Sequence, residues 1–489
     1  MHSQPATQPG AGKSPGLVLA ALCLASFMAT LDLFVVNVAL KDIGRDFSGQ
    51  GLSNLSWILN AYAIIFGALL IPAGRMADRY GRRNAFVVGL AVFVLASLAC
   101  GMAPDLWTLV GFRCLQAAGA AVLTPASLGL VLTALPGDRM ANGVRLWAVS
   151  AALAGAAGPV VGGLLTEVSW RWIFVINIPL GLVAAAVALT LIARDTRDSS
   201  TRIPDLLGSF LLVIGVGAAS LGLVKGPDWG WGSAPTSICW AVTVAAAAGF
   251  AASTRRSAVP VIDFRLFRSR VFTMANLSAA LLFGLTGMQL LSVSFFLQNS
   301  WHWSAVQTGL AIAPGPAMVF LASGPGQKLN ARFPAGRVAC AGFVLVAIGQ
   351  ALMTLSLHQW HSYAASMLPG WLILGTGLGF AMPTIVESAT VDLPPEESGT
   401  GSAINATARQ LGAVLATAVT VVILGDSAVT GAAARFYTTW WVVVIAAVAG
   451  AAVVLGISPS RRASAGHRGQ EKPSHVPCPD QLSGPVHLS

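Results

Sequence analysis

Residues 74–103 read GRMADRYGRRNAFVVGLAVFVLASLACGMA, a charged segment of ten residues followed by twenty residues that carry no charge. An α-helix rises about 1.5 Å per residue, so about 20 apolar residues cross the hydrocarbon core of a bilayer. Similar runs recur along the whole chain, which predicts an all-α polytopic membrane protein with fourteen transmembrane helices. The runs lie at 17–40, 54–73, 84–103, 107–133, 142–166, 172–193, 205–225, 235–253, 271–298, 305–325, 337–356, 363–387, 402–424 and 437–457.

The composition agrees with a membrane protein. Of the 489 residues, 55% are hydrophobic and only 10% are charged, whereas soluble domains carry about 25% charged residues. A net charge of +10 raises the question of nucleic acid, but such surfaces gather basic and aromatic residues on one water-facing element. Here the basic residues lie in short loops, so we expect the lipid bilayer as a partner and no nucleic acid.

Six cysteines are scattered through the chain, mostly inside apolar runs, without a CxxC pair or a nearby histidine pattern. We therefore expect no disulfide framework, no metal site and no cofactor. The cysteines are Cys23, Cys100, Cys114, Cys239, Cys340 and Cys478.

The two ends of the chain are polar. Residues 1–16 are rich in Pro and Gly, and the apolar run that follows lacks a good cleavage pattern, so we expect a retained first span and not a signal peptide. Residues 458–489 are rich in Ser, Pro, Gly, His and Arg and are predicted to be a disordered cytoplasmic tail.

The orientation follows from the basic residues, because cytoplasmic loops carry the excess of Lys and Arg. Of the 29 basic residues, 22 lie on the side of the two termini and five on the other side, while Arg113 and Arg409 lie within apolar runs. Twelve of the fourteen tryptophans fall at the predicted outer ends, as expected for a ring that prefers the interface. Both termini are therefore predicted to be cytoplasmic.

Two weak internal similarities predict a duplicated architecture. The basic segment 74–83 recurs loosely as residues 324–337. We expect a six-helix bundle at 17–193, two inserted helices at 205–253 and a second six-helix bundle at 271–457, with a substrate site between the bundles near the bilayer midplane.

The charged segment 74–83 combines four arginines with an acid and two glycines. A positive-inside anchor explains the arginines, but not Asp78, which can pair with a neighbouring basic residue as a latch that opens when helices move. The segment resembles the G-x-x-x-D-R-x-G-R-R signature of the major facilitator superfamily. The matching residues are Gly74, Asp78, Arg79, Gly81, Arg82 and Arg83.

Two ionisable residues lie within apolar runs of the first half. Asp32 in the first run would be desolvated, which favours its protonated form and suits it to exchange protons. Arg113 in the fourth run is a second candidate for proton coupling, within a string that resembles the superfamily's R-x-x-Q-G-x-G pattern although Ala117 replaces its first glycine. For both residues, a purely structural role within the bundle stays open.

The fifth run contains GAAGPVVGG at 155–163. The glycines permit close helix approach, and the proline removes a backbone donor and bends the helix, so a packing kink is one interpretation. The string also resembles the signature G-x-x-x-G-P-x-x-G-G of antiporters in the superfamily. The residues concerned are Gly155, Gly158, Pro159, Gly162 and Gly163.

Residues 31–40 resemble the L-D-x-T-V-V-N-V-A-L-P signature of the fourteen-span drug:proton antiporters, with Phe34 in place of Thr and Lys41 in place of Pro. Residues 169–181 and 403–412 are similar to further patterns of that branch. The resemblance, which includes actinomycete antibiotic exporters, implies a monomeric protein of the bacterial plasma membrane that exports small amphipathic drugs or antibiotics in exchange for protons. Few further acids lie in the late spans, which favours a neutral or weakly charged substrate over a strongly cationic one.

Two alternatives stay open within the superfamily, a proton-coupled symporter and a dedicated metabolite transporter. An enzyme is disfavoured because no reactive constellation lies in the spans. Small-molecule specificity in such cavities depends on a few polar contacts. The candidate cavity residues are Asn37, Gln116, Gln289, Asn405 and Arg409.

Overall fold

The computed structural model describes residues 15–47, 50–134, 138–192, 205–258, 260–357, 362–425 and 433–457. The predicted tail at 458–489 and nearly all of the predicted N-terminal segment lie outside these residues.

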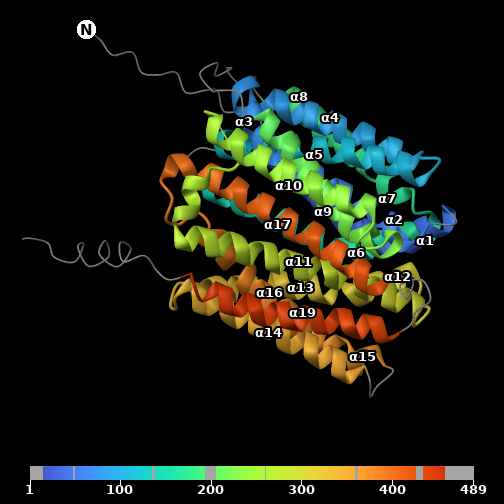
Figure 1. Ribbon diagram of the computed structural model, residues 1–489. Coiled ribbons are helices and arrows are strands. Elements are labelled where there is room, and N and C mark those ends of the chain that lie inside the picture. The colour runs from blue at the N-terminus through green and yellow to red at the C-terminus, as the bar shows by residue number, and fades with distance from the viewer. Residues whose placement is uncertain are drawn as a thin grey trace, which may run out of the picture.

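The described residues form helices and no strand, and fourteen helical segments are long and apolar enough to cross a membrane. The predicted fold class and number of spans are therefore confirmed. Figure 1 shows the helices running roughly side by side. They are α1 (Pro15–Asp46), α2 (Leu52–Leu55) with α3 (Trp57–Tyr80), α4 (Arg82–Gly101), α5 (Leu106–Ala134), α6 (Asp138–Val168), α7 (Trp172–Val175) with α8 (Asn177–Leu191), α9 (Leu206–Trp229), α10 (Ala234–Arg256), the 3-10 helix η1 (Phe264–Arg268), α11 (Arg270–Asn299), α12 (Ala305–Ile312) with α13 (Pro314–Asn330), α14 (Ala335–Ser356), α15 (Tyr363–Ser366) with α16 (Leu368–Ser388), α17 (Pro395–Leu424) and α19 (Ala433–Val454).

The charged segment at 74–83 was expected to be a loop between two spans, but most of it is helical. The apolar run ends at Ala73, but helix α3 continues through the charged residues to Tyr80. The break is a single residue, Gly81, whose φ of 98° lies in the left-handed region that glycine adopts without strain. Helix α4 begins at once with Arg82, so the charges at this turn are held on two helix ends.

The helices form two packed groups that the inserted pair bridges. Helices α1 to α8, the first half, pack mainly on one another, and α11 to α19, the second half, do the same. The inserted pair α9 and α10 packs together, and α9 also contacts α3 of the first half and α17 of the second. The halves meet mainly along two seams, where α3 contacts α17 and where α6 contacts α12 and α13, and α1 also contacts α11.

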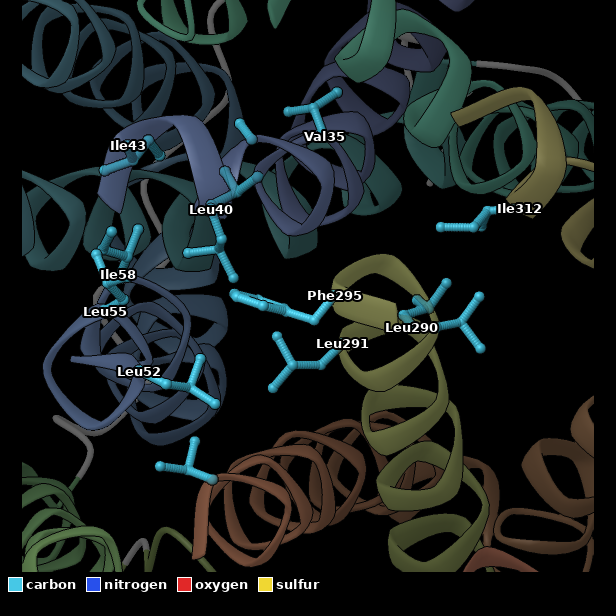
Figure 2. Close-up of a cluster of buried hydrophobic side chains, with 14 of the residues drawn as sticks. Val35, Leu40, Ile43, Leu52, Leu55, Ile58, Leu290, Leu291, Phe295 and Ile312 are labelled. Atoms are coloured by element: carbon cyan, nitrogen blue, oxygen red, sulfur yellow. The ribbon is translucent and has the colours of Figure 1, made fainter. Parts of the chain in front are cut away.

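The outer faces of the helices are apolar, as a lipid solvent requires. Large hydrophobic side chains such as Leu95, Val244 and Ile445 are about two-thirds exposed, at 65%, 69% and 67%. Inside, a cluster of buried apolar side chains joins the two halves (Figure 2), where Leu40 of α1 and Phe295 of α11 lie close together. Because each span crosses once, α1 begins and α19 ends at the same end of the molecule, here called the terminal end.

Candidate functional site

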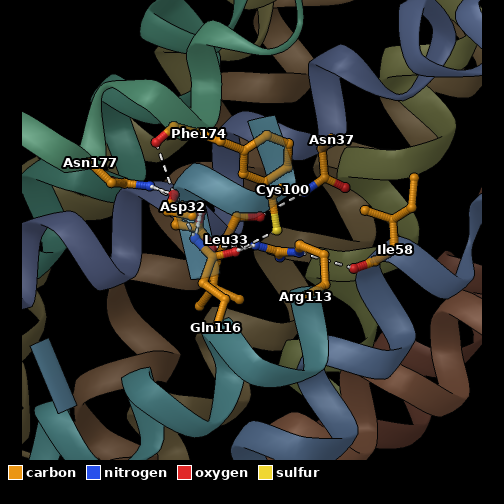
Figure 3. Close-up of polar contacts among 10 residues, drawn as sticks. Asp32, Leu33, Asn37, Ile58, Cys100, Arg113, Gln116, Phe174 and Asn177 are labelled. Carbon is orange, nitrogen blue, oxygen red and sulfur yellow. Dashed lines mark hydrogen bonds and ion pairs between the residues drawn. The ribbon is translucent and has the colours of Figure 1, made fainter. Parts of the chain in front are cut away.

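The first half buries an ion pair between the middle of α1 and the first third of α5. Arg113 Nη1 on α5 lies 2.5 Å from Asp32 Oδ2 on α1, and both side chains are fully buried (Figure 3). The structure thus brings together the two residues that the sequence singles out for proton coupling. An ion pair at this depth avoids the large penalty of a lone charge in an apolar medium.

Three polar side chains complete the surroundings of the carboxylate. Gln116 Nε2 donates to Asp32 Oδ1 at 2.9 Å, and Asn177 Nδ2 donates to the same oxygen at 3.3 Å. Both amides also donate to Ser97 Oγ, at 3.1 and 3.0 Å, and Ser97 donates to the carbonyl of Phe174 at 2.9 Å. Helices α1, α4, α5 and α8 therefore supply one connected network.

Arg113 has further partners that do not depend on Asp32. Its Nη1 donates to Gln116 Oε1 at 2.7 Å, and its Nε donates to the carbonyl of Ile58 at 3.3 Å. The guanidinium carbon lies 4.1 Å from the centre of the Tyr62 ring, a cation–π contact. The cation thus keeps two acceptors and an aromatic face when the carboxylate is neutral.

The glycines of α6 lie against α1. A Cβ at Gly158 would be 2.5 Å from Cβ of Phe34, and one at Gly162 would be 2.9 Å from the carbonyl oxygen of Val35. Gly155 also faces the Phe34 ring, at 3.5 Å. Phe34, which departs from the family pattern, fills the notch that these glycines leave.

The same helix face continues onto the second half. A Cβ at Gly163 would be 2.5 Å from the carbonyl oxygen of Ala305, and Gly309 of α12 lies directly against the carbonyl of Pro159. Helix α6 therefore approaches α1 on one side and α12 on the other at backbone distance. The glycine string is part of a seam between the halves.

The charged turn at the terminal end holds α3, α4, α5 and α8 together. Asp78 pairs with Arg82 at 2.8 Å, and Arg82 also donates to the carbonyl of Gly129 at 3.0 Å. Arg83 donates to the carbonyls of Ala188 and Leu189. The remaining residues of the signature pack locally: a Cβ at Gly74 would be 3.4 Å from Pro125, and the Arg79 guanidinium lies 5.8 Å from the centre of the Tyr80 ring.

The contact from this turn to the second half comes from a residue outside the predicted set. Arg75 Nη2 donates to Thr400 Oγ1 of α17 at 3.2 Å. The family signature accepts any residue at this position, so the pattern does not single out Arg75. The spacing of arginines on α3 alone does not say which one faces the other half.

The halves also touch at the end away from the termini. Lys41 Nζ donates to the carbonyl of Gln298 at 2.5 Å, and Gln298 Nε2 donates to the carbonyl of Val38 at 3.0 Å. Ser294 donates to the carbonyl of Asn37 at 3.2 Å. Together with the contact of Arg75 with Thr400, these bonds join the halves at both ends.

The predicted cavity residues fall into separate places. Asn37 donates to the carbonyl of Leu33 on its own helix, and Gln116 belongs to the ion-pair network. Gln289 on α11 is buried, and neither its amide nitrogen nor its oxygen has a partner among the described residues. Asn405 donates to Asn276 at 3.4 Å, while Arg409 stacks on Phe283. Their role in substrate binding stays a prediction.

Three members of the network were not predicted, namely Ser97, Tyr62 and Asn177. Asn177 lies in the string at 169–181 that carries the family resemblance, which was a usable signal. Ser97 and Tyr62 sit in ordinary apolar runs and gave none. Within the part of the chain that the structure describes, no three His, Cys, Asp or Glu residues are grouped as metal ligands.

Comparison with known families identifies the family of this chain. Residues 22–417 match the family model of the Major Facilitator Superfamily. The chain belongs to the Major Facilitator Superfamily. It is thus a multi-pass transporter of small molecules in the bacterial plasma membrane.

Relatives in this superfamily carry resistance names. The chain is 32% identical over 406 residues to the multidrug resistance protein Stp of Mycobacterium tuberculosis, covering 82% of this chain and 74% of the relative. It is 33% identical over 438 residues to the methylenomycin A resistance protein of Streptomyces coelicolor, covering 86% and 89%. The tetracenomycin C resistance and export protein of Streptomyces glaucescens is 30% identical over 412 residues, covering 84% and 76%.

Solved structures of the superfamily share the fold. A bacterial homologue of the human lysosomal transporter Spinster superposes with a TM-score of 0.65 at 18% identity, covering 91% of this chain and 97% of the other. At this identity the likeness concerns the arrangement of helices alone.

Proposed function

We propose that the protein is a proton-coupled antiporter that exports small amphipathic drugs or antibiotics by alternating access, with its terminal end in the cytoplasm. The observation that carries the proposal is the fully buried pair of Asp32, in the middle of α1, and Arg113. A carboxyl group in such a place is the chain's best candidate to bind and release a proton during transport. The resistance names of the relatives support export.

The proton acts on the ion pair. When Asp32 is ionised, it accepts from Arg113, Gln116 and Asn177. Proton binding neutralises the carboxyl group and removes the Coulomb attraction to Arg113, which keeps the Gln116 oxygen and the Ile58 carbonyl as acceptors. The two protonation states therefore differ in how tightly α1 is held to α5.

The driving force is adequate for coupled transport. Moving one charge across the membrane contributes about 2.3 kcal/mol per 100 mV, in addition to the pH gradient. If protonation changes the free-energy difference between the two conformations by a few kcal/mol, this is enough to reverse the equilibrium between them. In our proposal, proton entry resets the halves after substrate release.

The moving surfaces are the two seams and the contact of α1 with α11. In each conformation the halves must part at one end while they stay in contact at the other. In our proposal, the Arg75 contact with Thr400 holds the terminal end closed, and the bonds of Lys41 and Gln298 hold the opposite end closed. We infer that opening to either side breaks one of these sets.

The test uses a bacterium that lacks its own drug pumps. Cells expressing the full chain should survive a broad antibiotic panel better than control cells, and a protonophore should abolish the lower drug accumulation. Asp32→Asn should lose this export, while Arg255→Gln, at an exposed position near the end of α10, should keep it. Asp32→Glu tests whether a carboxyl group alone restores coupling.

Two results would contradict the proposal. One is export by Asp32→Asn that still responds fully to the protonophore. The other is a lack of protection across the whole panel despite normal membrane levels, which would favour a symporter or a dedicated metabolite transporter.

A further inference from the structure

A second cation lies at mid-helix depth in the second half. Arg409 stands near the middle of α17, fourteen residues after Pro395 and fifteen before Leu424. On either side of it, α17 packs closely on its neighbours: Thr407 donates to the carbonyl of Gly67 on α3, and Gly412 meets the backbone of Ala280 on α11. Arg409 therefore stands on a helix that packs against α3 of the first half and against α11 of the second.

Arg409 has no anionic partner in the part of the chain that the structure describes. No ion pair and no hydrogen bond of its side chain is found there, and its Nε is buried without an acceptor. The side chain is partly buried, and its guanidinium carbon lies 4.9 Å from the centre of the Phe283 ring.

The described spans contain no acid that is free to pair with it. Asp32 is the acid at mid-helix depth, and it is already bound to Arg113. The other acids of these helices lie within five residues of a helix end. Arginine keeps its proton at all relevant pH values, so this site stays positive unless an anion enters it.

We propose that Arg409 binds the carboxylate of the transported compound, so that the preferred substrates are amphipathic organic acids. This inference rests on the proposed function and specifies its substrate class. A guanidinium binds a carboxylate with two parallel hydrogen bonds, and the Phe283 ring beside it offers a surface for an apolar or aromatic body.

A neighbouring amide adds a polar contact. Asn405 lies one helical turn before Arg409, which places both on one face of α17. It is buried, and its Oδ1 has no donor among the described residues. A hydroxyl or N–H group next to the substrate carboxylate would satisfy this oxygen.

The test compares acids with neutral compounds of the same shape. The probes are three pairs: 2-naphthoate and 2-naphthamide, 4-biphenylcarboxylate and its amide, and indole-3-acetate and its amide. Dissociation constants are measured by equilibrium dialysis with the purified full chain in detergent at pH 7. We expect at least one acid to bind about tenfold or more tightly than its amide, because charge-assisted hydrogen bonds exceed neutral ones by this order.

The variants locate the preference. Arg409→Gln should remove the acid preference while amide binding stays within about threefold, and Arg409→Lys should keep part of it, since a point charge remains without the bidentate geometry. Arg255→Gln is the matched control and should behave as wild type. The inference would be overturned if the wild type bound each acid and its amide with equal dissociation constants, or bound neither. It would also be overturned if Arg409→Gln kept the full preference for acids.

This measurement is independent of proton coupling. Binding is at equilibrium without a gradient, so Asp32→Asn should keep the acid preference even though it loses coupled export. If only the antiport proposal is wrong, the dialysis results stay as expected. If only the inference about Arg409 is wrong, export still responds to the protonophore.

Discussion

The buried pair makes a quantitative prediction about charge removal. Asp32→Asn leaves Arg113 as an uncompensated cation. Breaking a buried pair in this way lowers the free energy of unfolding by about 3–5 kcal/mol. Arg113 keeps the Gln116 oxygen, the Ile58 carbonyl and the Tyr62 ring, so we expect the lower end, about 3 kcal/mol. Arg113→Gln should cost about 1 kcal/mol less, because Asp32 can become neutral by binding a proton.

The double variant separates charge from packing. Asp32→Asn with Arg113→Gln leaves neutral amides that still hydrogen-bond with Gln116 and Asn177. Its stability should return to within about 1 kcal/mol of wild type, since neither member is left as a buried charge. The coupling energy between the two sites should therefore be about 3 kcal/mol.

The assay is denaturant-induced unfolding of the purified protein in detergent micelles at pH 7, followed by tryptophan fluorescence. The four proteins of the cycle are compared at the same protein and detergent concentrations. Additive losses, with the double variant as unstable as the sum of the single ones, would refute our account of the pair. So would a single Arg113→Gln variant that is less stable than Asp32→Asn.

Three further changes test the seams and the charged turn. Gly158→Val should abolish transport, because a Cβ there would lie 2.5 Å from an α1 side chain. The control Gly111→Ala places a Cβ that meets nothing within 4 Å and should keep transport. Drug accumulation in cells distinguishes the two variants. Arg75→Ala removes the bond to Thr400 and should make cysteines at the terminal end more accessible to a thiol reagent, as should Thr400→Val; unchanged labelling in both would show that this bond does not hold the end closed. Gly81→Ala places a side chain at a φ of 98° and should lower the unfolding free energy by about 1 kcal/mol; a loss no larger than that of Gly111→Ala would contradict the strain argument.

The number and order of the spans could be predicted from sequence because bilayer thickness fixes the length of each apolar run. The end of α3 could not, since Gly74 to Tyr80 are too polar to count as a span but still form helix. Hydropathy reports the solvent around a helix, whereas the helix itself ends where Gly81 permits a left-handed conformation.

The site was predictable in part. Asp32 and Arg113 stand out because a charge is rare in an apolar run, but 81 residues separate them and only the packing of α1 on α5 shows that they pair. Gln116 is a predicted cavity residue, and its bond to the Asp32 carboxylate is a contact that the sequence does not indicate. Arg75 was missed because the facing of α3 toward α17 depends on the docking of the halves, which local periodicity does not encode.

Phe34 has a mechanical consequence of its own. It stands two residues from Asp32 on α1, and its ring is seated between Gly155 and Gly158 of α6. A rigid helix cannot shift at one of these positions without shifting at the other, so any displacement that protonation imposes on α1 must carry α6 with it or unseat the ring. The bulky side chain thus couples the movement of α1 to that of α6. A smaller side chain at this position would allow the two helices to slide along each other.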